Sequence, residues 1–333
     1  MNVSEVYNRM PSIYTEGNVS GNASMGFMRN SPLDSAISIF AIIILFITMM
    51  SLGSTMEISK IKAHLFKPKG PAIALVSQFC IMPLTAFCLA KILQMSPVKT
   101  LIVLVCGCCP GGNWSNIFSL AIEGDMNLSI VMTTCSNLAA LGLMPLMLYL
   151  FSQGFPGLET AVPYSGIITA LALSLLPCVI GIAINHYRPQ YSPVIRNVGI
   201  SILIISGIIV FILVGYNVRD KIWMVLKADI LSASALMPLT GFMLGYVLSG
   251  ICGLSPRCSR TISMETGCQN TQLCFAVLKM IPPQVTGPLI LFPLLYYSFQ
   301  CAEGLLLVLC FRWFRKFKAH EAVRVLNPTS PSH

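Results

Sequence analysis

Long apolar stretches alternate with short polar segments along nearly the whole of this 333-residue chain. We count nine stretches, each close to or longer than the roughly 20 apolar residues that a helix needs to cross a bilayer. They are residues 35–56, 71–93, 98–122, 126–152, 164–185, 197–217, 223–251, 261–281 and 286–314. The pattern predicts an all-α polytopic membrane protein with nine transmembrane helices, contained in a transmembrane domain at 35–318.

The composition supports this class and excludes others. Only 10% of residues are charged and 55% are hydrophobic, whereas soluble domains carry about 25% charged residues. The chain is also too apolar to be disordered, because disorder needs low hydrophobicity and high charge. The net charge of +9 is spread over short loops and the C-terminal end, with no basic domain, so we do not expect nucleic-acid binding.

The placement of the cations predicts the orientation in the membrane. Of the 21 Lys and Arg residues, 13 fall in alternate polar segments and the C-terminal end, and such segments are normally cytoplasmic. Residues 1–34 show no signal-peptide core but contain three glycosylation sequons, at Asn2, Asn18 and Asn22. We therefore expect a plasma-membrane protein with an extracellular, glycosylated N-terminal tail (1–34) and a cytoplasmic C-terminal tail (319–333).

Two apolar stretches are interrupted by polar and helix-breaking residues near their centres, at 109–116 and at 264–272. In hydrocarbon, non-helical backbone is tolerated only where protein or a water-filled cavity surrounds it. A pair of interrupted spans in the two halves of a chain indicates the binding site of a secondary transporter. Asn116 and Asn270 are 154 positions apart, close to half the chain. We therefore expect an inverted repeat in which one copy lacks a helix.

Glu265 is the most informative single residue in the interrupted stretches. A charge at the centre of a membrane helix costs about 2.5–3.5 kcal/mol on insertion scales, and no Lys, Arg or His lies deep in any apolar stretch to balance it. A bound cation would balance the carboxylate; the alternative is a protonated, hydrogen-bonded structural residue. For Glu303, beside Gly304, the structural interpretation is favoured.

Hydroxyl and amide side chains in other apolar stretches could join Glu265 in binding a cation. Hard cations prefer such oxygen ligands. Ser115 and Asn116 lie in the first interruption, and Ser129 and Thr133 are spaced i, i+4 on one helix face. The pair at 129 and 133 could instead bond to its own helix backbone. Gln78 and Gln269 are candidates for a second ion site or for an interhelical hydrogen bond. Half-helix N-termini at the interruptions would attract an anionic substrate group.

The remaining chemistry points away from catalysis. No nucleophile elbow, P-loop, dinucleotide-binding or metalloprotease motif is present in the sequence, so we do not expect an enzyme. Most of the 13 cysteines lie inside apolar stretches and the four histidines lie outside them, which disfavours disulfides and zinc. We expect no cofactor and no metal other than co-transported sodium.

Four segments resemble the sodium/bile acid cotransporter family: 60–70, 109–116, 124–136 and 264–274. The similarity runs from about residue 33 to residue 318. It implies a panel domain (35–56 and 164–217), a core domain (71–152 and 223–314) and two discontinuous helices that cross in the core.

The resemblance also implies site residues. One sodium ion would be bound by Ser115, Asn116, Ser129, Thr133 and Glu265. A second would be bound by Gln78 and Gln269 with carbonyls around Thr266 and Cys268, and Asn113 and Asn270 would lie near the bile acid. Trp114 and Phe275 depart from the family pattern next to the expected cavity, which bears on the substrate range.

The expected function is sodium-coupled symport of bile salts into the cell by alternating access. The expected partners are sodium, bile salts of the taurocholate type and membrane lipid. Two alternatives stay open at this point: a sodium-coupled carrier of sulfated steroids or other amphipathic anions, and a transport-silent membrane receptor. Matched interruptions with an oxygen-rich shell disfavour the receptor, which has no need of them.

Overall fold

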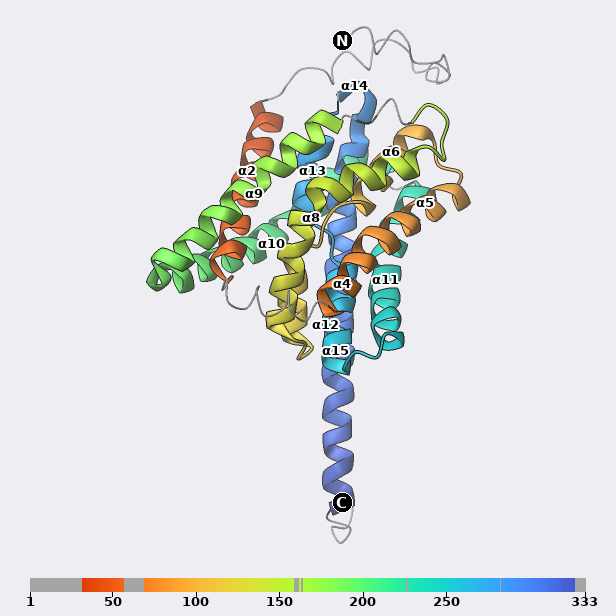
Figure 1. Cartoon of the computed structure of the whole chain (residues 1–333). Helices are drawn as coiled ribbons and strands as arrows, with labels where there is room; N and C mark the ends of the chain where they lie inside the picture. The colour runs from red at the N-terminus through yellow and green to blue at the C-terminus, as the bar shows by residue number, and fades with distance from the viewer. Residues whose placement is uncertain are drawn as a thin grey trace.

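The computed structural model describes residues 32–56, 69–158, 162, 164–225, 227–281 and 283–326. In these residues every element is helical, and the long last helix runs through the bundle and extends beyond it (Figure 1). Three features of the sequence lie outside the described residues: the sequons at Asn2, Asn18 and Asn22, the segment 57–68, and the end of the C-terminal tail from residue 327.

Each predicted apolar stretch contains helix in the described residues, and the stretches 98–122 and 261–281 are broken at 108–113 and 268–270. The elements in chain order are α2 (Pro32–Ser54), α4 (Lys69–Val76), the π-helical turn η2 (Ser77–Ile81), α5 (Met82–Ile92), α6 (Pro97–Gly107), α7 (Trp114–Ala121), α8 (Met126–Ser152), α9 (Tyr164–Tyr187), the 3-10 turn η3 (Pro189–Tyr191), α10 (Ser192–Val225), α11 (Ala228–Ile251), α12 (Pro256–Gly267), α13 (Thr271–Leu278), α14 (Pro283–Thr286), the 3-10 turn η4 (Gly287–Leu291) and α15 (Phe292–Leu326).

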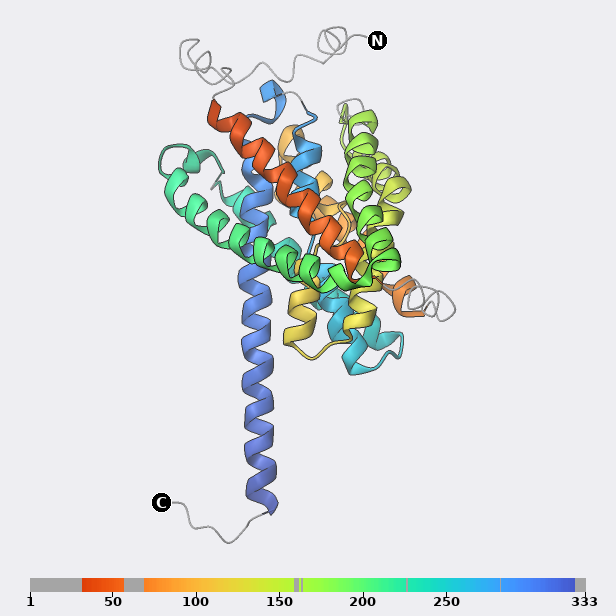
Figure 2. The ribbon, with the colours of Figure 1, turned by 90° about the vertical axis from the view of Figure 1, so that its left-hand side faces the viewer.

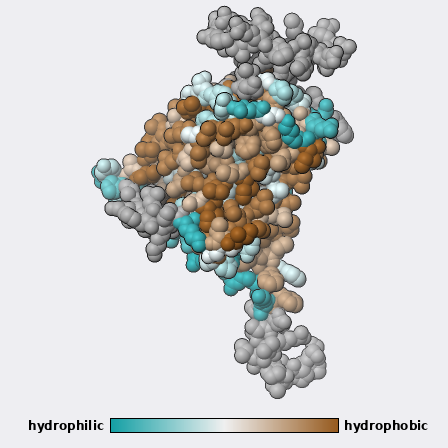
Figure 3. Space-filling model, turned by 45° about the vertical axis from the view of Figure 1, so that its right-hand side comes forward, coloured by the Kyte–Doolittle hydropathy of each residue, from teal (hydrophilic) through white to brown (hydrophobic). Residues whose placement is uncertain are grey.

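Six helical segments of the described chain are long and apolar enough to cross a membrane: 69–92, 126–152, 164–187, 189–209, 228–251 and 289–318. Two shorter apolar helices, Ile42–Ser54 and Pro97–Gly107, accompany them. The outer surface carries many exposed large apolar side chains, which form a broad hydrophobic band between more hydrophilic ends (Figure 3). These features confirm an all-helical, multi-pass membrane protein.

The last helix extends beyond the last apolar stretch. The apolar stretch ends near residue 314, but α15 continues to Leu326 and projects far beyond the bundle (Figures 1 and 2). Lys, Arg, Glu and Ala are good helix formers, so the helix persists where hydrophobicity stops. The first part of the predicted tail at 319–333 is therefore helical.

Helices α2, α9 and α10 pack together as one group on one side of the bundle (Figure 2). Small residues allow the close approach: a Cβ at Gly53 of α2 would lie 2.0 Å from the Cys178 carbonyl oxygen of α9, and one at Gly181 would lie 2.2 Å from the Met50 carbonyl oxygen. In α11, Gly245 similarly faces Thr266 of α12. These are close helix contacts of the kind that small residues produce in membranes.

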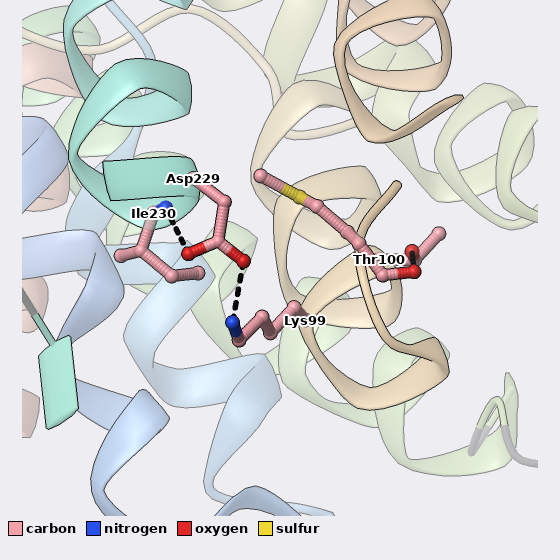
Figure 4. A network of polar contacts seen from close by, with 5 residues as sticks. Lys99, Thr100, Asp229 and Ile230 are labelled. Carbon is pink, nitrogen blue, oxygen red and sulfur yellow. Dashed lines mark hydrogen bonds and ion pairs between the residues drawn. The ribbon is translucent and has the colours of Figure 1, made fainter. Parts of the chain in front are cut away.

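An ion pair between Lys99 and Asp229 joins the starts of α6 and α11 (Figure 4). The side chains are only 16% and 22% exposed, and Asp229 also accepts a hydrogen bond from the Ile230 N–H at 3.0 Å. We expect Asp229→Asn to lower the free energy of unfolding by about 1 kcal/mol, seen as a lower melting temperature in detergent. In the Lys99→Met background the same change should cost less, and equal costs in both backgrounds would show that the pair contributes nothing.

Candidate functional site

The two interrupted helices meet at their breaks. Between α6 and α7, the Gly112 N–H donates to the Cys268 carbonyl at 2.8 Å, and between α12 and α13 the Asn270 N–H donates to the Pro110 carbonyl at 2.9 Å. Gly111 and Gln269 form the antiparallel bridge between them. Each break therefore satisfies backbone groups of the other, which the apolar interior requires.

Glycine is needed at this crossing because the two backbones are so close. A Cβ at Gly112 would lie 2.5 Å from the Gln269 carbonyl oxygen, and one at Gly111 would lie 2.2 Å from Glu265 Oε1. Neither glycine has a positive φ. Lack of space alone therefore excludes a side chain at either position. The two glycines let the backbone of the second break, at Gln269, approach the first.

Glu265 lies at the centre of a buried cluster of oxygen atoms from α7, α8 and α12. Its carboxylate oxygen Oε2 accepts hydrogen bonds from Ser115 Oγ at 2.6 Å and from Thr133 Oγ1 at 2.9 Å. The residue is 1% exposed, and its second oxygen, Oε1, has no hydrogen-bond partner in the described residues. A buried carboxylate with an unused oxygen is a site to which a cation could bind.

Two more predicted ligands lie beside this cluster. Ser129 Oγ donates to Asn116 Oδ1 at 2.8 Å. Thr133 Oγ1 is also 3.0 Å from the Ser129 carbonyl oxygen, so the alternative of bonding to its own helix is present together with the contact to Glu265. The structure thus brings together all five residues assigned to one ion, and their functional groups are hydroxyls, an amide and a carboxylate.

Gln78 and Gln269 are in direct contact. Gln78 lies in the π-helical turn η2 and is fully buried; its Nε2 donates to Gln269 Oε1 at 2.7 Å and to the Cys109 carbonyl at 2.9 Å. The interhelical hydrogen bond that the sequence left open is therefore formed. Gln78 Oε1 and Gln269 Nε2 are buried without partners in the described residues.

Of the carbonyls assigned beside that pair, the one of Cys268 is already engaged, and so is the Thr266 hydroxyl, which was not assigned to the ion. The Thr266 hydroxyl donates to the Ile262 carbonyl at 2.8 Å, and the Cys268 carbonyl accepts the Gly112 N–H. Both residues lie at the end of α12 next to the crossing, within the region the sequence predicted.

A cavity of about 560 Å³ separates α2, α9 and α10 from α7 and α8. Asn113 and Asn116 are on its wall, so it reaches the first helix break and one residue of the oxygen cluster. The turn η3 between α9 and α10 supplies Pro189 to its other end. That turn lies toward the side of the bundle from which α15 projects (Figures 1 and 2).

The structure does not bring the two predicted substrate asparagines together on this wall. Asn270 is not among the cavity-lining residues. Its Oδ1 caps α13 by accepting the Leu273 N–H at 3.0 Å, and its Nδ2 is 3.4 Å from Asn137 Oδ1. In this conformation Asn270 shapes the helix break, as Asn residues commonly do at helix starts.

Trp114, one of the two residues that depart from the family pattern, lies away from the cavity wall. It packs against Phe118 and Tyr297, with ring centroids 5.6 Å and 6.0 Å away. A Cβ at Gly207 of α10 would lie 3.1 Å from its ring. Trp114 therefore contacts α10 where that helix passes α7. Phe275, on α13, has the Lys279 ammonium 5.4 Å from its ring centroid.

Sequence reasoning missed three polar residues that support the crossing. Asn137 Nδ2 is 3.4 Å from the Gly111 carbonyl oxygen, Ser136 Oγ accepts the Gly111 N–H at 3.2 Å, and Gln300 Oε1 accepts the Gln269 N–H at 3.0 Å. Gln300 is fully buried. Asn137 and Gln300 could have been found from the sequence, because each is an amide side chain within a long apolar stretch and needs a partner inside the membrane.

Comparison with known proteins gives the family. Residues 42–222 match the model of the sodium bile acid symporter family. The human hepatic sodium/bile acid cotransporter is 53% identical over 290 residues, covering 86% of this chain and 83% of the relative. The rabbit ileal sodium/bile acid cotransporter is 37% identical, covering 86% and 83%. The human sodium-dependent organic anion transporter is 34% identical, covering 88% and 78%.

The family-model match includes the first interrupted helix, the three relatives match 86–88% of the chain, and their names describe carriers rather than enzymes. The matches agree with the family resemblance of the four segments 60–70, 109–116, 124–136 and 264–274. The chain belongs to the sodium bile acid symporter family.

Proposed function

We propose that this protein is a sodium-coupled symporter that carries bile salts into the cell. The observation that carries the proposal is the buried oxygen cluster around Glu265, built at two mutually bonded helix breaks and continuous with a cavity through Asn116. The relatives named as sodium/bile acid cotransporters, from hepatic and ileal sources, support sodium as the driving ion and bile salts as cargo.

In this proposal the first sodium ion binds among Ser115, Asn116, Ser129, Thr133 and Glu265. The ion offsets the carboxylate charge and uses the free Oε1 of Glu265. Because the ligands come from α7, α8 and α12, a bound ion joins three helices and fixes the wall that carries Asn113 and Asn116. The bile salt then binds to a cavity wall that the ion has already ordered, so less conformational entropy of the protein is lost when the bile salt binds.

The second sodium ion binds near Gln78 and Gln269, with carbonyls around Thr266 and Cys268. The free Gln78 Oε1 supplies an oxygen for it. Rotation of the Gln269 amide away from Gln78 would supply a second oxygen, at the loss of the present 2.7 Å hydrogen bond. Sodium is cargo at both sites, and the proposal needs no resident cofactor.

Alternating access would come from movement of a core domain against a panel domain. We assign 35–56 and 164–217 to the panel and 71–152 and 223–314 to the core, within nine spans arranged as an inverted repeat that lacks one helix. The mutual packing of α2, α9 and α10 and the cavity between that group and α7 and α8 support this division. The cavity end at η3 would face the cytoplasm.

A carrier of sulfated steroids or other amphipathic anions is the second candidate. It is supported by the relative named as a sodium-dependent organic anion transporter. The two candidates share the sodium chemistry and differ in cargo, so the same cells should be offered both classes of compound.

The proposed function is tested by uptake of radiolabelled taurocholate in cells that express the chain. Uptake should be high in sodium medium and fall to the level of untransfected cells when choline replaces sodium. Sodium-dependent uptake of a steroid sulfate without taurocholate uptake would favour the second candidate. Sodium-independent entry of both would reject symport.

The proposed orientation predicts glycosylation and antibody access. Deglycosylation of the expressed protein should increase its gel mobility through loss of glycan at Asn18 or Asn22, with Asn2 a third acceptor. An antibody against residues 320–333 should stain plasma membranes only after permeabilisation. Staining of that segment in intact cells would contradict an odd number of spans with an extracellular N-terminus.

Gln300 provides a prediction about the second ion site. Gln300→Leu removes the acceptor of the Gln269 N–H, and an unsatisfied buried donor costs about 1–3 kcal/mol. We expect the half-saturating sodium concentration to rise and the sigmoidal sodium dependence of uptake to become shallower, while Gln300→Glu, which keeps an acceptor oxygen, retains more function. Sodium curves that superimpose on wild type at equal surface expression would contradict the prediction.

A further inference from the structure

The cavity between α2, α9, α10 and α7, α8 has one charged residue among its described lining residues, Arg196. The rest of the wall combines amides and hydroxyls, such as Asn113, with apolar side chains such as Leu120, Ile130 and Leu203. A largely apolar cavity with few polar groups is the usual form of a small-molecule site. The positive charge of Arg196 favours a ligand that carries a negative charge.

Arg196 is held at the cavity by the packing of its helix. It lies in α10 one turn from Gly199, where a Cβ would meet Ser51 Cβ of α2 at 2.1 Å. Ser51 Oγ also donates to the Arg196 carbonyl at 3.3 Å. These contacts fix the backbone of α10 against α2, while the Arg196 side chain is exposed.

The guanidinium group has no carboxylate within 4.0 Å among the residues that the structure describes. Its charge is therefore not offset by any described residue. A guanidinium pairs with planar or tetrahedral oxyanions through two parallel hydrogen bonds, so it suits carboxylates and sulfonates.

We propose that Arg196 pairs with the anionic group of an amphipathic substrate in this cavity and orients that group toward the α9–α10 turn. The inference rests on the proposed function, because it assumes that the cavity holds the transported anion. The apolar body of the substrate would then lie against the Leu120, Ile130 and Leu203 side of the cavity. Arg196 is a specificity-determining residue in this account, and removing it should weaken anionic ligands selectively.

The competing interpretation is that Arg196 is only an interfacial cation that sets topology. The two interpretations differ in one measurable quantity, the coupling between the charge of the residue and the charge of the ligand. A thermodynamic cycle over both changes isolates that coupling. A cation that only sets topology would affect charged and uncharged ligands equally.

The experiment uses inside-out membrane vesicles that contain the full chain, so that ligands reach the cavity from the η3 side. Taurocholate and the uncharged methylamide of cholic acid compete with radiolabelled taurocholate for sodium-dependent transport. The variants are Arg196→Gln, Arg196→Lys and the matched control Arg188→Gln. Arg188 is also exposed and lies just before η3, but it is not among the cavity-lining residues.

The ratio of the two inhibition constants, uncharged over anionic, should fall about fivefold in Arg196→Gln, since a partly exposed ion pair contributes up to about 1 kcal/mol. Arg196→Lys should keep most of the ratio and Arg188→Gln all of it. An unchanged ratio in Arg196→Gln would overturn the inference. Arg196→Met repeats the test if the Gln variant does not reach the membrane.

Failure of this inference and failure of the proposed function give different results. If wild-type vesicles transport taurocholate only with sodium and the ratio does not respond to Arg196, the proposed function stands and the role of Arg196 falls. If wild-type vesicles show no sodium-dependent taurocholate transport, the proposed function itself is wrong.

Discussion

Replacing Glu265 with glutamine should raise the half-saturating sodium concentration for uptake about thirtyfold. Glutamine keeps the volume and one acceptor oxygen but removes the charge that balances the cation, and losing one member of a buried charge pair costs about 2 kcal/mol or more. Ser115 and Thr133 can still donate to the remaining oxygen, so folding and surface delivery should survive. Apparent bile-salt affinity should fall too, because coupled ligands change each other's binding by the same factor.

The measurement is taurocholate uptake against sodium concentration for both proteins at matched surface expression. Glu303→Gln serves as the control, since Glu303 has the same chemistry on α15 but makes no described contact with the oxygen cluster. If Glu265 is only a structural, protonated acid, glutamine would replace it and the two sodium curves would superimpose. That outcome would remove Glu265 from the ion site.

Replacing Gly112 with alanine should abolish sodium-dependent uptake. The new methyl group would lie 2.5 Å from the Gln269 carbonyl oxygen and 2.8 Å from its carbonyl carbon. Both atoms belong to backbone that is hydrogen-bonded across the crossing, so neither can move without breaking the contact between the two breaks. Overpacking of this kind costs about 1–3 kcal/mol and displaces Ser115 and Gln269 relative to one another.

Gly142→Ala is the matched control for this change. Gly142 is exposed in the middle of α8, and an added Cβ would meet nothing within 4 Å. Alanine there should leave uptake intact, because alanine is the better helix former by about 1 kcal/mol. Normal uptake by Gly112→Ala would show that the crossing tolerates separation and is not essential to the site.

The helices and the main site residues could be predicted because other arrangements of the same residues in a membrane would be energetically unfavourable. Apolar stretches of about 20 residues have few alternatives to membrane helices, and a buried carboxylate such as Glu265 demands compensation. The same logic led from the interruptions to Ser115, Asn116, Gln78 and Gln269. Ser115 contacts Glu265, and Gln78 contacts Gln269, although the composition of the ion shell itself stays a proposal.

Other features depend on three-dimensional contacts that no local pattern encodes. Asn270 caps α13, a role that suits an asparagine at a helix break, and its place near the substrate stays a prediction. Asn137 Nδ2 reaches the Gly111 carbonyl and Gln300 Oε1 accepts the Gln269 N–H, and both backbone groups lie more than 20 positions away in sequence. α15 continues past the apolar stretch because helix propensity, and not hydrophobicity, decides where a helix stops outside the membrane.

The central claim is tested most directly by measuring both fluxes in proteoliposomes that contain the purified full chain. An inward sodium gradient should drive taurocholate to a transient internal concentration above the external one, and an inward taurocholate gradient should drive entry of radioactive sodium. Both fluxes should be strongly reduced in Glu265→Gln at low sodium. Taurocholate entry that only equilibrates, with no accompanying sodium flux, would contradict sodium-coupled symport.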